Sequence, residues 1–584
     1  MFSCRLLIAS AASVALFIGV PAAMAASQTW ANIGNDWSVG ANWGGSAPGA
    51  SGLGSGTSDV ATFPEIAPGS LVTPNLDENR SIGAIVFDNT DGVYNLTGTS
   101  DLRVNRATVN GVADTYFRII GGGTTQIDAS NIEIVRGGGG SGTFNFNLGT
   151  GTLNLQGQVF FSHNGPRNLD VHGGTLNLNG GLLANTTGND GRFLNVVESG
   201  NILINGYSRT DTNRRSQVRT DFDFTGVLSL AGTFDANMTD GGNNAIQHRG
   251  GTLEIRSSFD MPVAQHIQWQ AYAGTVLQAG SGGATVNNLV RITSIDGSQD
   301  FQGPTIGGSN DLSLDGGFRF EMENSSTATL FITNTGKTTF GGSQFWIGNT
   351  STVSRSMEID IANGSLAEIT AQVIKGDTLD PPGNNPADLI LSGGGTLILS
   401  NNDNVYNGTT TVNDTATLIV DGVLTDAGST VFITSGATLG GTGTINRNVE
   451  ISGILSPGNS PGTLTFGEDL ELLSGSSMDF EVGSTSDLVV VLGELTVVDG
   501  FVVNLSEFDS GFSDTELVLF QDFTSFTGDV STWVFNLPAL WESADVLVDG
   551  SAILLTNIEV IPEPTTAALM GLASLALLRR RRAA

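Results

Sequence analysis

Short alternations of apolar and polar residues run along most of this chain and predict β-strands. Glu-Ile-Asp-Ile at 358–361 and Thr-Leu-Asn-Leu at 152–155 each place every second side chain on one apolar face. Clusters of Gly, Asn, Asp and Ser separate such runs, as turn residues do between strands. Few helical periods of any length appear outside the two terminal segments, so the pattern predicts an all-β chain.

A Gly-Thr-Leu-x-Leu pattern recurs along the chain with irregular spacing. It occurs as GTLNLQG (151–157), GGTLNLNG (173–180), GGTLEIRS (250–257), GGGTLILS (393–400) and GTLTF (462–466), with a looser form LSLAGTF (228–234). One such unit cannot bury its apolar face alone, whereas stacked units share a continuous core. The pattern favours an elongated stack of coils, and a set of antiparallel β-sandwiches is the alternative that the same alternation allows.

The clearest unit follows residue 391. Its expected strands are Thr396–Leu399, Thr409–Val412 and Thr417–Val420. The unit resembles the autotransporter-associated β-strand repeat, including the core Tyr406-Asn407-Gly408-Thr409, and the resemblance covers roughly 391–500. It implies a right-handed parallel β-solenoid. The chain has no long C-terminal series of alternating strands, so the export route of autotransporters is not expected.

Composition narrows the class of protein. The 584 residues carry a net charge of −33 and include 79 glycines, while only 14% of residues are charged. Such acidity argues against binding to nucleic acid or to anionic membranes. The only cysteine is Cys4, which lies in the segment that we interpret next as a signal peptide. The mature chain is then expected to lack disulfides and cysteine ligands.

The N-terminal segment has the order of a secretory signal peptide. A positive start with Arg5 is followed by an apolar run and by Ala23-Met24-Ala25, so cleavage is expected before Ala26. An uncleaved N-terminal anchor is the alternative. The apolar run is short for a membrane span, which favours cleavage.

The C-terminal segment has a second distinctive order. Pro562-Glu563-Pro564 precedes an apolar run at 567–578, which is followed by Arg579-Arg580-Arg581-Arg582. Twelve helical residues span about 18 Å, less than the roughly 30 Å hydrocarbon core of a bilayer. Residues 565–578 are therefore expected to contact the membrane transiently, with the arginines on the cytoplasmic side. A plain tail anchor is the alternative.

This tail resembles the PEP-CTERM sorting signal, and the same tail is also labelled an ice-binding protein C-terminal domain. The resemblance implies processing by exosortase, a membrane protease-transpeptidase, in a bacterium that typically makes exopolysaccharide. It also implies a transient inner-membrane intermediate and then delivery to the outer envelope, the cell surface or the extracellular matrix. The ice-binding label concerns the tail and does not show ice binding by the body.

Six parts are expected in this chain. They are a signal peptide (1–25), a Trp-rich N-terminal cap with the first coils (26–105), an irregular β-solenoid (106–390), a β-solenoid with the autotransporter-associated repeat (391–500), a C-terminal β cap (501–558) and the sorting signal with its short apolar helix (559–584). Trp30, Trp37 and Trp43 are expected to plug the first coil. An aromatic sugar-binding platform is the alternative for these tryptophans.

Candidate catalytic groups are few. The histidines (His163, His172, His248 and His266) have no metal-ligand spacing, and His172 is expected in a solvated turn. Three carboxylate pairs (Asp221/Asp223, Glu358/Asp360 and Asp479/Glu481) alternate with apolar residues, which places each pair about 7 Å apart on one strand face. Such a separation suits an inverting glycosidase. Because the arrangement recurs, we interpret it as a solvated outer face, and no catalytic or metal site is predicted.

Two weaker signals concern ligands. GGSNDLSLD at 307–315 is loosely similar to a calcium-binding nonapeptide, although Asn310 stands where Gly is expected, so calcium is a minor option and no other cofactor is predicted. A basic cluster (Arg209, Arg214, Arg215 and Arg219) is expected to form a surface loop that could touch acidic polysaccharide.

We therefore expect an exported, non-catalytic β-solenoid with a structural or adhesive role in the bacterial envelope or the exopolysaccharide matrix. The expected partners are exosortase and envelope glycans, and no nucleic acid. A polysaccharide lyase or hydrolase on the same scaffold is the alternative. An ice-binding protein is a minor alternative, suggested by Thr409-Thr410-Thr411, Thr415 and Thr417.

Overall fold

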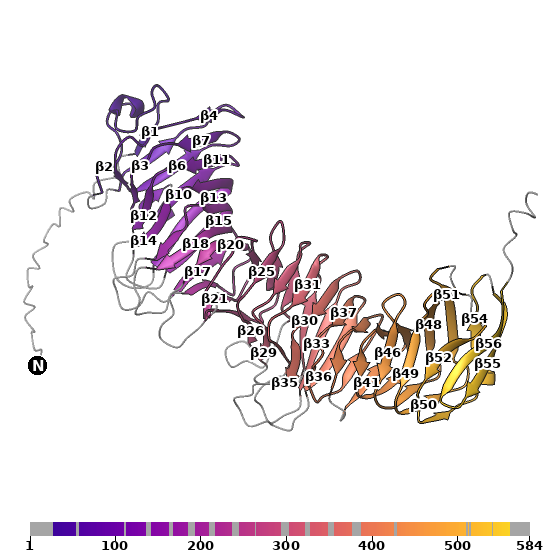
Figure 1. Cartoon of the computed structure of the whole chain (residues 1–584). Coiled ribbons are helices and arrows are strands. Elements are labelled where there is room, and N and C mark those ends of the chain that lie inside the picture. The colour runs from indigo at the N-terminus through magenta and orange to yellow at the C-terminus, as the bar shows by residue number, and fades with distance from the viewer. Residues whose placement is uncertain are drawn as a thin grey trace, which may run out of the picture.

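The chain forms an elongated stack of β-coils in the computed structural model (Figure 1). The structure describes residues 27–53, 58–109, 112–135, 142–162, 167–184, 193–209, 217–235, 244–262, 264–293, 303–321, 327–347, 355–375, 387–425, 429–509, 512, 515–539 and 541–560. Nearly all strand pairs in these residues are parallel, and each pair joins one coil to the next. The prediction of a parallel β-solenoid is confirmed, and the β-sandwich alternative is wrong.

Each coil contributes strands to three faces. The first face comprises β1 (Ser27–Thr29), β3 (Val60–Phe63), β6 (Ala84–Asp88), β10 (Val112–Ile120), the first parts of β13 (Gly142–Leu155) and β15 (Arg167–Leu178), β17 (Phe193–Glu198), β19 (Gln217–Thr220), β21 (Asn244–His248), β23 (His266–Gln270), β26 (Val290–Thr293), β29 (Phe318–Glu321), β32 (Gln344–Ile347), β35 (Gln372–Lys375), β40 (Val423–Leu424), β43 (Thr444–Ile445), β46 (Thr463–Phe466), β49 (Leu488–Val491) and β52 (Leu517–Gln521).

The second face comprises β4 (Leu71–Val72), β7 (Val93–Leu96), β11 (Thr124–Ile127), the second parts of β13 and β15, the first parts of β18 (Asn201–Arg209) and β20 (Val227–Phe234), β22 (Thr252–Ile255), β24 (Val276–Ala279), β27 (Thr305–Gly307), β30 (Thr327–Ile332), β33 (Arg355–Ile361), β36 (Ala387–Gly393), β38 (Thr410–Val412), β41 (Thr430–Ile433), β44 (Asn448–Ile451), β47 (Leu470–Leu472), β50 (Glu494–Val497) and β53 (Ser525–Thr527).

The third face comprises β5 (Arg80–Ile82), β8 (Leu102–Val104), β12 (Asn131–Val135), β14 (Gln158–Ser162), β16 (Leu182–Ala184), the ends of β18 and β20, and then β25 (Ala284–Val286), β28 (Leu312–Leu314), β31 (Lys337–Phe340), β34 (Leu366–Ile369), β37 (Thr396–Leu399), β39 (Thr417–Val420), β42 (Thr438–Gly441), β45 (Ile454–Pro457), β48 (Ser477–Val482), β51 (Val502–Glu507) and β54 (Val534–Asn536). Short elements at corners and ends are β2 (Ala50–Ser51), β9 (Ala107–Val109), η1 (Gly40–Trp43) and η2 (Val530–Thr532).

The strands expected around the Tyr406 motif agree closely with the structure. β37 and β39 have the predicted bounds, and β38 starts one residue later than expected, at Thr410. The Gly-Thr-Leu motif, however, does not mark one face. It lies on the second face in β13, β15 and β22, but on the third in β37 and on the first in β46. Because the coils differ in length, the motif's glycine lies at a different corner in different coils, and the strand that follows it belongs to a different face.

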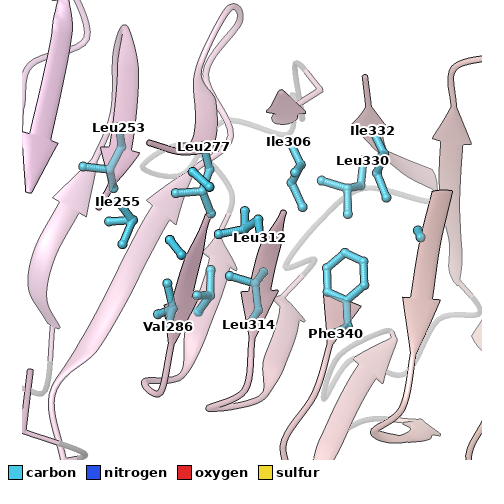
Figure 2. Close-up of a cluster of buried hydrophobic side chains, with 14 of the residues drawn as sticks. Leu253, Ile255, Leu277, Val286, Ile306, Leu312, Leu314, Leu330, Ile332 and Phe340 are labelled. Atoms are coloured by element: carbon cyan, nitrogen blue, oxygen red, sulfur yellow. The ribbon is translucent and has the colours of Figure 1, made fainter. Parts of the chain in front are cut away.

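One hydrophobic interior runs between the three faces. In its middle part, Leu253, Leu277, Ile306 and Ile332 stack from successive coils of the second face, opposite Val286, Leu314 and Phe340 of the third (Figure 2). These side chains are essentially inaccessible to solvent. Because no unit closes its core alone, each coil depends on its neighbours.

The third face is interrupted where the stack bends (Figure 1). An isolated bridge joins Thr233 to Asp260, and the next described strand of this face, β25, pairs only with β28. A polar groove of about 300 Å³ lies at the interruption, lined by residues that include Ser257, Thr285 and Lys337. Among the described residues, the break therefore leaves one edge of β25 without a partner strand.

Tryptophans fill the N-terminal end of the interior. Trp30, Trp37 and Trp43 are at most 2% exposed. Trp43 contacts Phe63 of β3 with ring centroids 5.3 Å apart, and its indole N–H donates to the carbonyl of Trp37 at 2.8 Å. The sugar-platform alternative is wrong, because none of the three rings faces solvent.

The C-terminal end is closed by antiparallel strands. β56 (Ala552–Val560) pairs with β52 and with β55 (Trp541–Asp549), both antiparallel. Trp533 packs on Phe501 with ring centroids 5.1 Å apart. The hairpin thus extends the sheet of the first face by two antiparallel strands beyond β52.

Candidate functional site

The first candidate carboxylate pair does not lie on a strand. Asp221 and Asp223 follow β19 in a turn, in which the Phe224 amide donates to the Asp221 carbonyl. The Asp221 carboxylate accepts the amide of Phe222 at 2.7 Å. The prediction that this pair shares one strand face is wrong, because β19 ends at Thr220 and the chain turns there.

The second pair occupies the outer face of β33, as predicted. Glu358 and Asp360 alternate there with buried Met357 and Ile359. The Glu358 carboxylate accepts hydroxyl hydrogen bonds from Thr329 and from Ser392, both at 2.7 Å. Those residues lie in the coils on either side, so Glu358 is part of a hydrogen-bond ladder between coils.

The third pair borders a polar pocket of about 390 Å³. Asp479 and Glu481 lie on the outer face of β48, and Asp487 comes from the corner before β49. The wall opposite is the loop 457–460. Asp479 accepts an amide hydrogen bond from Asn504 at 2.8 Å, which ties it to the next coil.

Asp487 has the most altered acidity in this pocket. The residue is 3% exposed, and its carboxylate accepts hydrogen bonds from the backbone amides of Glu481 and Gly462 at 2.7 and 2.8 Å. Burial raises the pKa of Asp487 to about 6; the two amide hydrogen bonds oppose this shift, whereas the charge of Glu481 adds to it. Sequence reasoning missed Asp487, because its role depends on the fold of the Ser-Thr-Ser-Asp corner rather than on strand periodicity.

The histidines lie apart from this pocket. His248 is fully buried; its Nε2–H donates to the Val276 carbonyl at 3.0 Å, and its Nδ1 accepts from the Thr220 hydroxyl at 3.2 Å. Burial lowers the pKa of His248 to about 3, which keeps the ring neutral. His172 lies within β15, directly before the left-handed Gly173 and Gly174, and its Nε2 lies 3.0 Å from the Asp170 carboxylate. Its side chain is 45% exposed, so the predicted exposure to solvent is confirmed, although the residue belongs to a strand and not to a turn. His163 lies outside the described residues.

In the candidate calcium-binding segment at 307–315, oxygen atoms that could bind a cation accept hydrogen bonds from other protein groups. The Asp311 carboxylate accepts the Lys337 amide at 2.8 Å, and the Asn310 carbonyl accepts the Asn334 side chain at 3.1 Å. Within the described ranges, no group of three or more His, Cys, Asp or Glu side chains is arranged to hold a metal ion.

The basic cluster is only partly described. Arg219 lies on β19, not in a loop, and its Nε donates to Asn195 at 2.6 Å, while Asn195 donates to Asn168 at 3.1 Å. Arg219 therefore belongs to a ladder across three coils. The side chain of Arg209, and Arg214 and Arg215 entirely, lie outside the described residues.

The described threonines of the third face near Tyr406 form a short row. Thr396, Thr417 and Thr438 stack on the third face, and Ile454 occupies the next position. Thr410, the middle residue of the triple threonine, is buried against Tyr406. No long threonine row therefore forms at these coils, which does not favour ice binding.

The residues that carry the predicted sorting chemistry follow directly on the last strand. β56 ends at Val560, two residues before Pro562. Residues 560–582 match the PEP-CTERM protein-sorting motif. The motif implies an exported protein that is recognised by exosortase and anchored or processed at the membrane. A search of curated proteins found no match to the chain.

Both processing sites lie outside the described residues. These are Pro562, Glu563, Pro564 and Arg579–Arg582 at the tail, and Ala23, Ala25 and Ala26 at the signal peptide; the expected helix at 567–578 lies outside them too. In the part of the chain that the structure describes, no helix has the length and apolar character of a membrane span.

Proposed function

We propose that this protein is a non-catalytic, exported β-solenoid with a structural or adhesive role in the envelope or exopolysaccharide matrix. The PEP-CTERM motif directly behind the last strand carries the proposal, since it addresses an elongated β-stack to the outside of the cell. The outer faces support it, because Glu358 and Arg219 each bond to a neighbouring coil instead of converging on a catalytic centre.

The proposed mechanism is passive. Hydrogen-bond ladders of Asn, Thr and acidic side chains hold the coils in register, and the same groups offer a repetitive polar surface to envelope glycans. Asn536, Asn504 and Asp479 form one such ladder, with contacts of 2.6 and 2.8 Å. A surface of this kind needs no cofactor.

Localisation and processing test the proposal together. The protein is purified from its own cells and its intact mass is measured. We expect a product that begins near Ala26 and lacks Arg579–Arg582, recovered from the cell surface or the matrix. A product that retains these arginines would contradict processing. A chain whose Pro562-Glu563-Pro564 is replaced by alanines should remain in the membrane fraction.

A polysaccharide-active enzyme is the second candidate, and the pocket with Asp479, Glu481 and Asp487 favours it. A carboxyl with a pKa of about 6 can donate a proton at mildly acidic pH, as a general acid must. The processed protein is incubated with acidic and neutral polysaccharides. Cleavage that is lost in Asp479→Asn and in Asp487→Asn would overturn the non-catalytic proposal, whereas no cleavage of any polymer supports it.

A further inference from the structure

We propose that the first face binds a linear acidic polysaccharide, whose sugar carboxylates lie along a row of arginine and amide side chains in the middle of the stack. The inference rests on the proposed adhesive role and deepens it, because it names the class of glycan, the face and the residues that bind it.

One outward position of the first face repeats through successive coils. The strand register aligns Arg219, Gln247, Gln268, Arg291, Arg319 and Trp346, which we call the arginine–amide row. Each of these side chains is partly exposed. Because neighbouring coils lie about 4.8 Å apart, the row is about 24 Å long and runs along the stack axis. Figure 1 shows β21, β26 and β29 of this face one after another at the bend of the stack.

The arginine–amide row is positive in an otherwise acidic protein. With histidines neutral, the first-face strands from β19 to β32 carry three arginines and one glutamate, Glu321, which gives a net charge of +2. The later first-face strands β40, β43, β46, β49 and β52 carry no charged residue. Charges more than about 8 Å away are largely screened at physiological ionic strength. The local charge of this face therefore governs its contact with a polymer.

His266 on β23 reports the sign of the potential at this face. Burial lowers the pKa of His266, and the charges of Arg291 and Arg319 lower it further. The opposing effect of Glu321 is the smallest of these influences. The guanidinium groups therefore dominate the local potential, although both contact Glu321.

Hydrogen bonds and stacking hold the two guanidinium groups in place. Arg291 donates from Nε and Nη2 to the Glu321 carboxylate at 3.1 and 2.7 Å, and the Arg319 Nε lies 2.8 Å from the same carboxylate. The Arg319 Cζ lies 3.8 Å from the ring centroid of Trp346. Side chains held in this way lose little further freedom when a ligand binds.

Arg291 retains donors for a ligand. Its side chain is 29% exposed, and its Nη1 has no protein partner among the described residues. A guanidinium matches the geometry of a carboxylate, and hydrogen bonds between such charged groups are stronger than those between neutral groups. The carboxylate of an acidic sugar is therefore a suitable partner for this position.

Aromatic rings at the adjoining corner favour a sugar over a simple anion. Phe222, shortly after Arg219, is 56% exposed, and its ring stacks on Tyr272 with centroids 6.4 Å apart. The Cζ of Arg249 lies 5.6 Å from the centroid of the Tyr272 ring. Sugar rings combine hydroxyl groups with an apolar C–H face, which packs on aromatic rings. The corner and the row together therefore match a polymer of acidic sugars.

A nucleic acid fits this face less well. Duplex DNA carries one negative charge per about 1.7 Å, so the acidic body repels it more strongly than a polymer with one carboxylate per sugar. A face with a net charge of +2 also offers few phosphate contacts. Double-stranded DNA is therefore the competing polyanion in the test.

Binding of two linear polyuronates, alginate and polygalacturonate, to the processed protein tests the proposal. Isothermal titration calorimetry measures the affinity for oligomers of increasing length, with neutral dextran as the comparison. We expect an affinity that falls as NaCl is raised and that grows with length until about 24 Å is covered. Absence of binding by both polyuronates, equal binding of dextran, or tighter binding of double-stranded DNA would overturn the proposal.

Three variants separate ligand binding from a structural role. Arg291→Gln and Arg319→Gln each remove a positive charge and should weaken polyuronate binding by roughly tenfold. Glu321→Gln removes the opposing charge and should strengthen binding. A purely structural cluster predicts the same direction of change in all three, because each variant breaks the same set of ion pairs. Such a uniform change would overturn the proposal.

Arg256→Gln is the matched control. Arg256 also pairs with a glutamate, Glu254, but it follows β22 of the second face. This variant should bind polyuronate like the unaltered protein, and an equal loss of affinity would show that the first face is not the site. Thermal melting checks that each variant is folded.

The result separates this inference from the proposed function. Absence of polyuronate binding would remove the first face as a glycan site and leave export, processing and a structural role intact. A product that retains Arg579–Arg582 would instead contradict processing and leave the calorimetric result unaffected.

Discussion

At the scale of single residues, a buried guanidinium binds the backbone of the Tyr-Asn-Gly-Thr sequence at 406–409. Arg447 is fully buried and donates to the carbonyl oxygens of Tyr406 and Gly408, the latter at 3.0 Å. Its Cζ lies 4.2 Å from the centroid of the Tyr406 ring, and the Tyr406 hydroxyl bonds to Thr410 at 2.6 Å. No carboxylate is needed, because carbonyl dipoles and the aromatic ring stabilise the cation.

Arg447→Met should therefore destabilise these coils. The methionine fills similar space but leaves two buried carbonyl oxygens without a donor, at a cost on the order of 2–4 kcal/mol. Urea unfolding followed by tryptophan fluorescence measures the change. Arg256→Met is the matched control, since Arg256 is largely exposed and its loss should change the free energy of unfolding by less than about 0.5 kcal/mol. Equal losses in the free energy of unfolding for the two variants would contradict this stabilising role of the buried Arg447 guanidinium.

His248 should make the fold sensitive to acid. Its folded pKa of about 3 lies below the unfolded value of 6.5, so the folded state binds fewer protons between these values. The stability that the neutral ring contributes is complete above pH 6.5 and is lost as the pH falls towards 3, by about 1.4 kcal/mol per pH unit. His248→Gln preserves a donor and an acceptor but does not titrate, so its stability should fall less steeply. Parallel pH profiles would contradict this assignment.

Asp487 should change the stability of the fold with pH in the opposite direction to His248. Its folded pKa of about 6 lies above the ordinary aspartate value of 3.8, so the folded state holds the proton more tightly. The stability associated with this group is therefore highest in acid and declines as the pH rises from about 4 to 6. Exchange of the Gly462 and Glu481 amides, measured against pH, should accelerate across that interval. Exchange rates that show no step after correction for intrinsic chemistry would contradict it.

At the scale of elements, glycine corners decide how closely coils approach. A Cβ on Gly408 would lie 2.2 Å from the carbonyl oxygen of Ala387 in the coil before it, so only glycine fits.

Strand positions were predictable because alternation alone specifies which side chains enter the core. β37 and β39 match their predicted bounds for that reason. The prediction that Asp221 and Asp223 share a strand face was wrong because the same alternation of Asp and Phe also occurs in a turn.

Gly408→Ala should open the contact between β36 and β38. The added methyl group must displace backbone, and we expect a loss of roughly 2 kcal/mol or more. Hydrogen exchange should localise the loss to these two strands. Gly45→Ala is the control, because a Cβ there meets no atom within 4 Å. Similar exchange in both variants would show that the corner tolerates a side chain.

At the scale of the whole molecule, repulsion between the many negative charges destabilises the stack of closely spaced coils. The chain carries −33 in total, and the proposed removal of Arg5 and the four terminal arginines would leave the body more acidic. Because salt screens repulsion between charges of one sign, the melting temperature should rise with NaCl. Scanning calorimetry at several NaCl concentrations measures it, and an unchanged or falling melting temperature would contradict the prediction.

The sequence by itself determined the strand periodicity, the stacked architecture and the C-terminal sorting motif, because each depends on local order along the chain. Only the tertiary structure decided which groups meet across coils. Arg447 reaches Tyr406 from 41 residues away, and Asp487 joins Gly462 across 25 residues. Irregular coil lengths set those distances, and no fixed spacing encodes them.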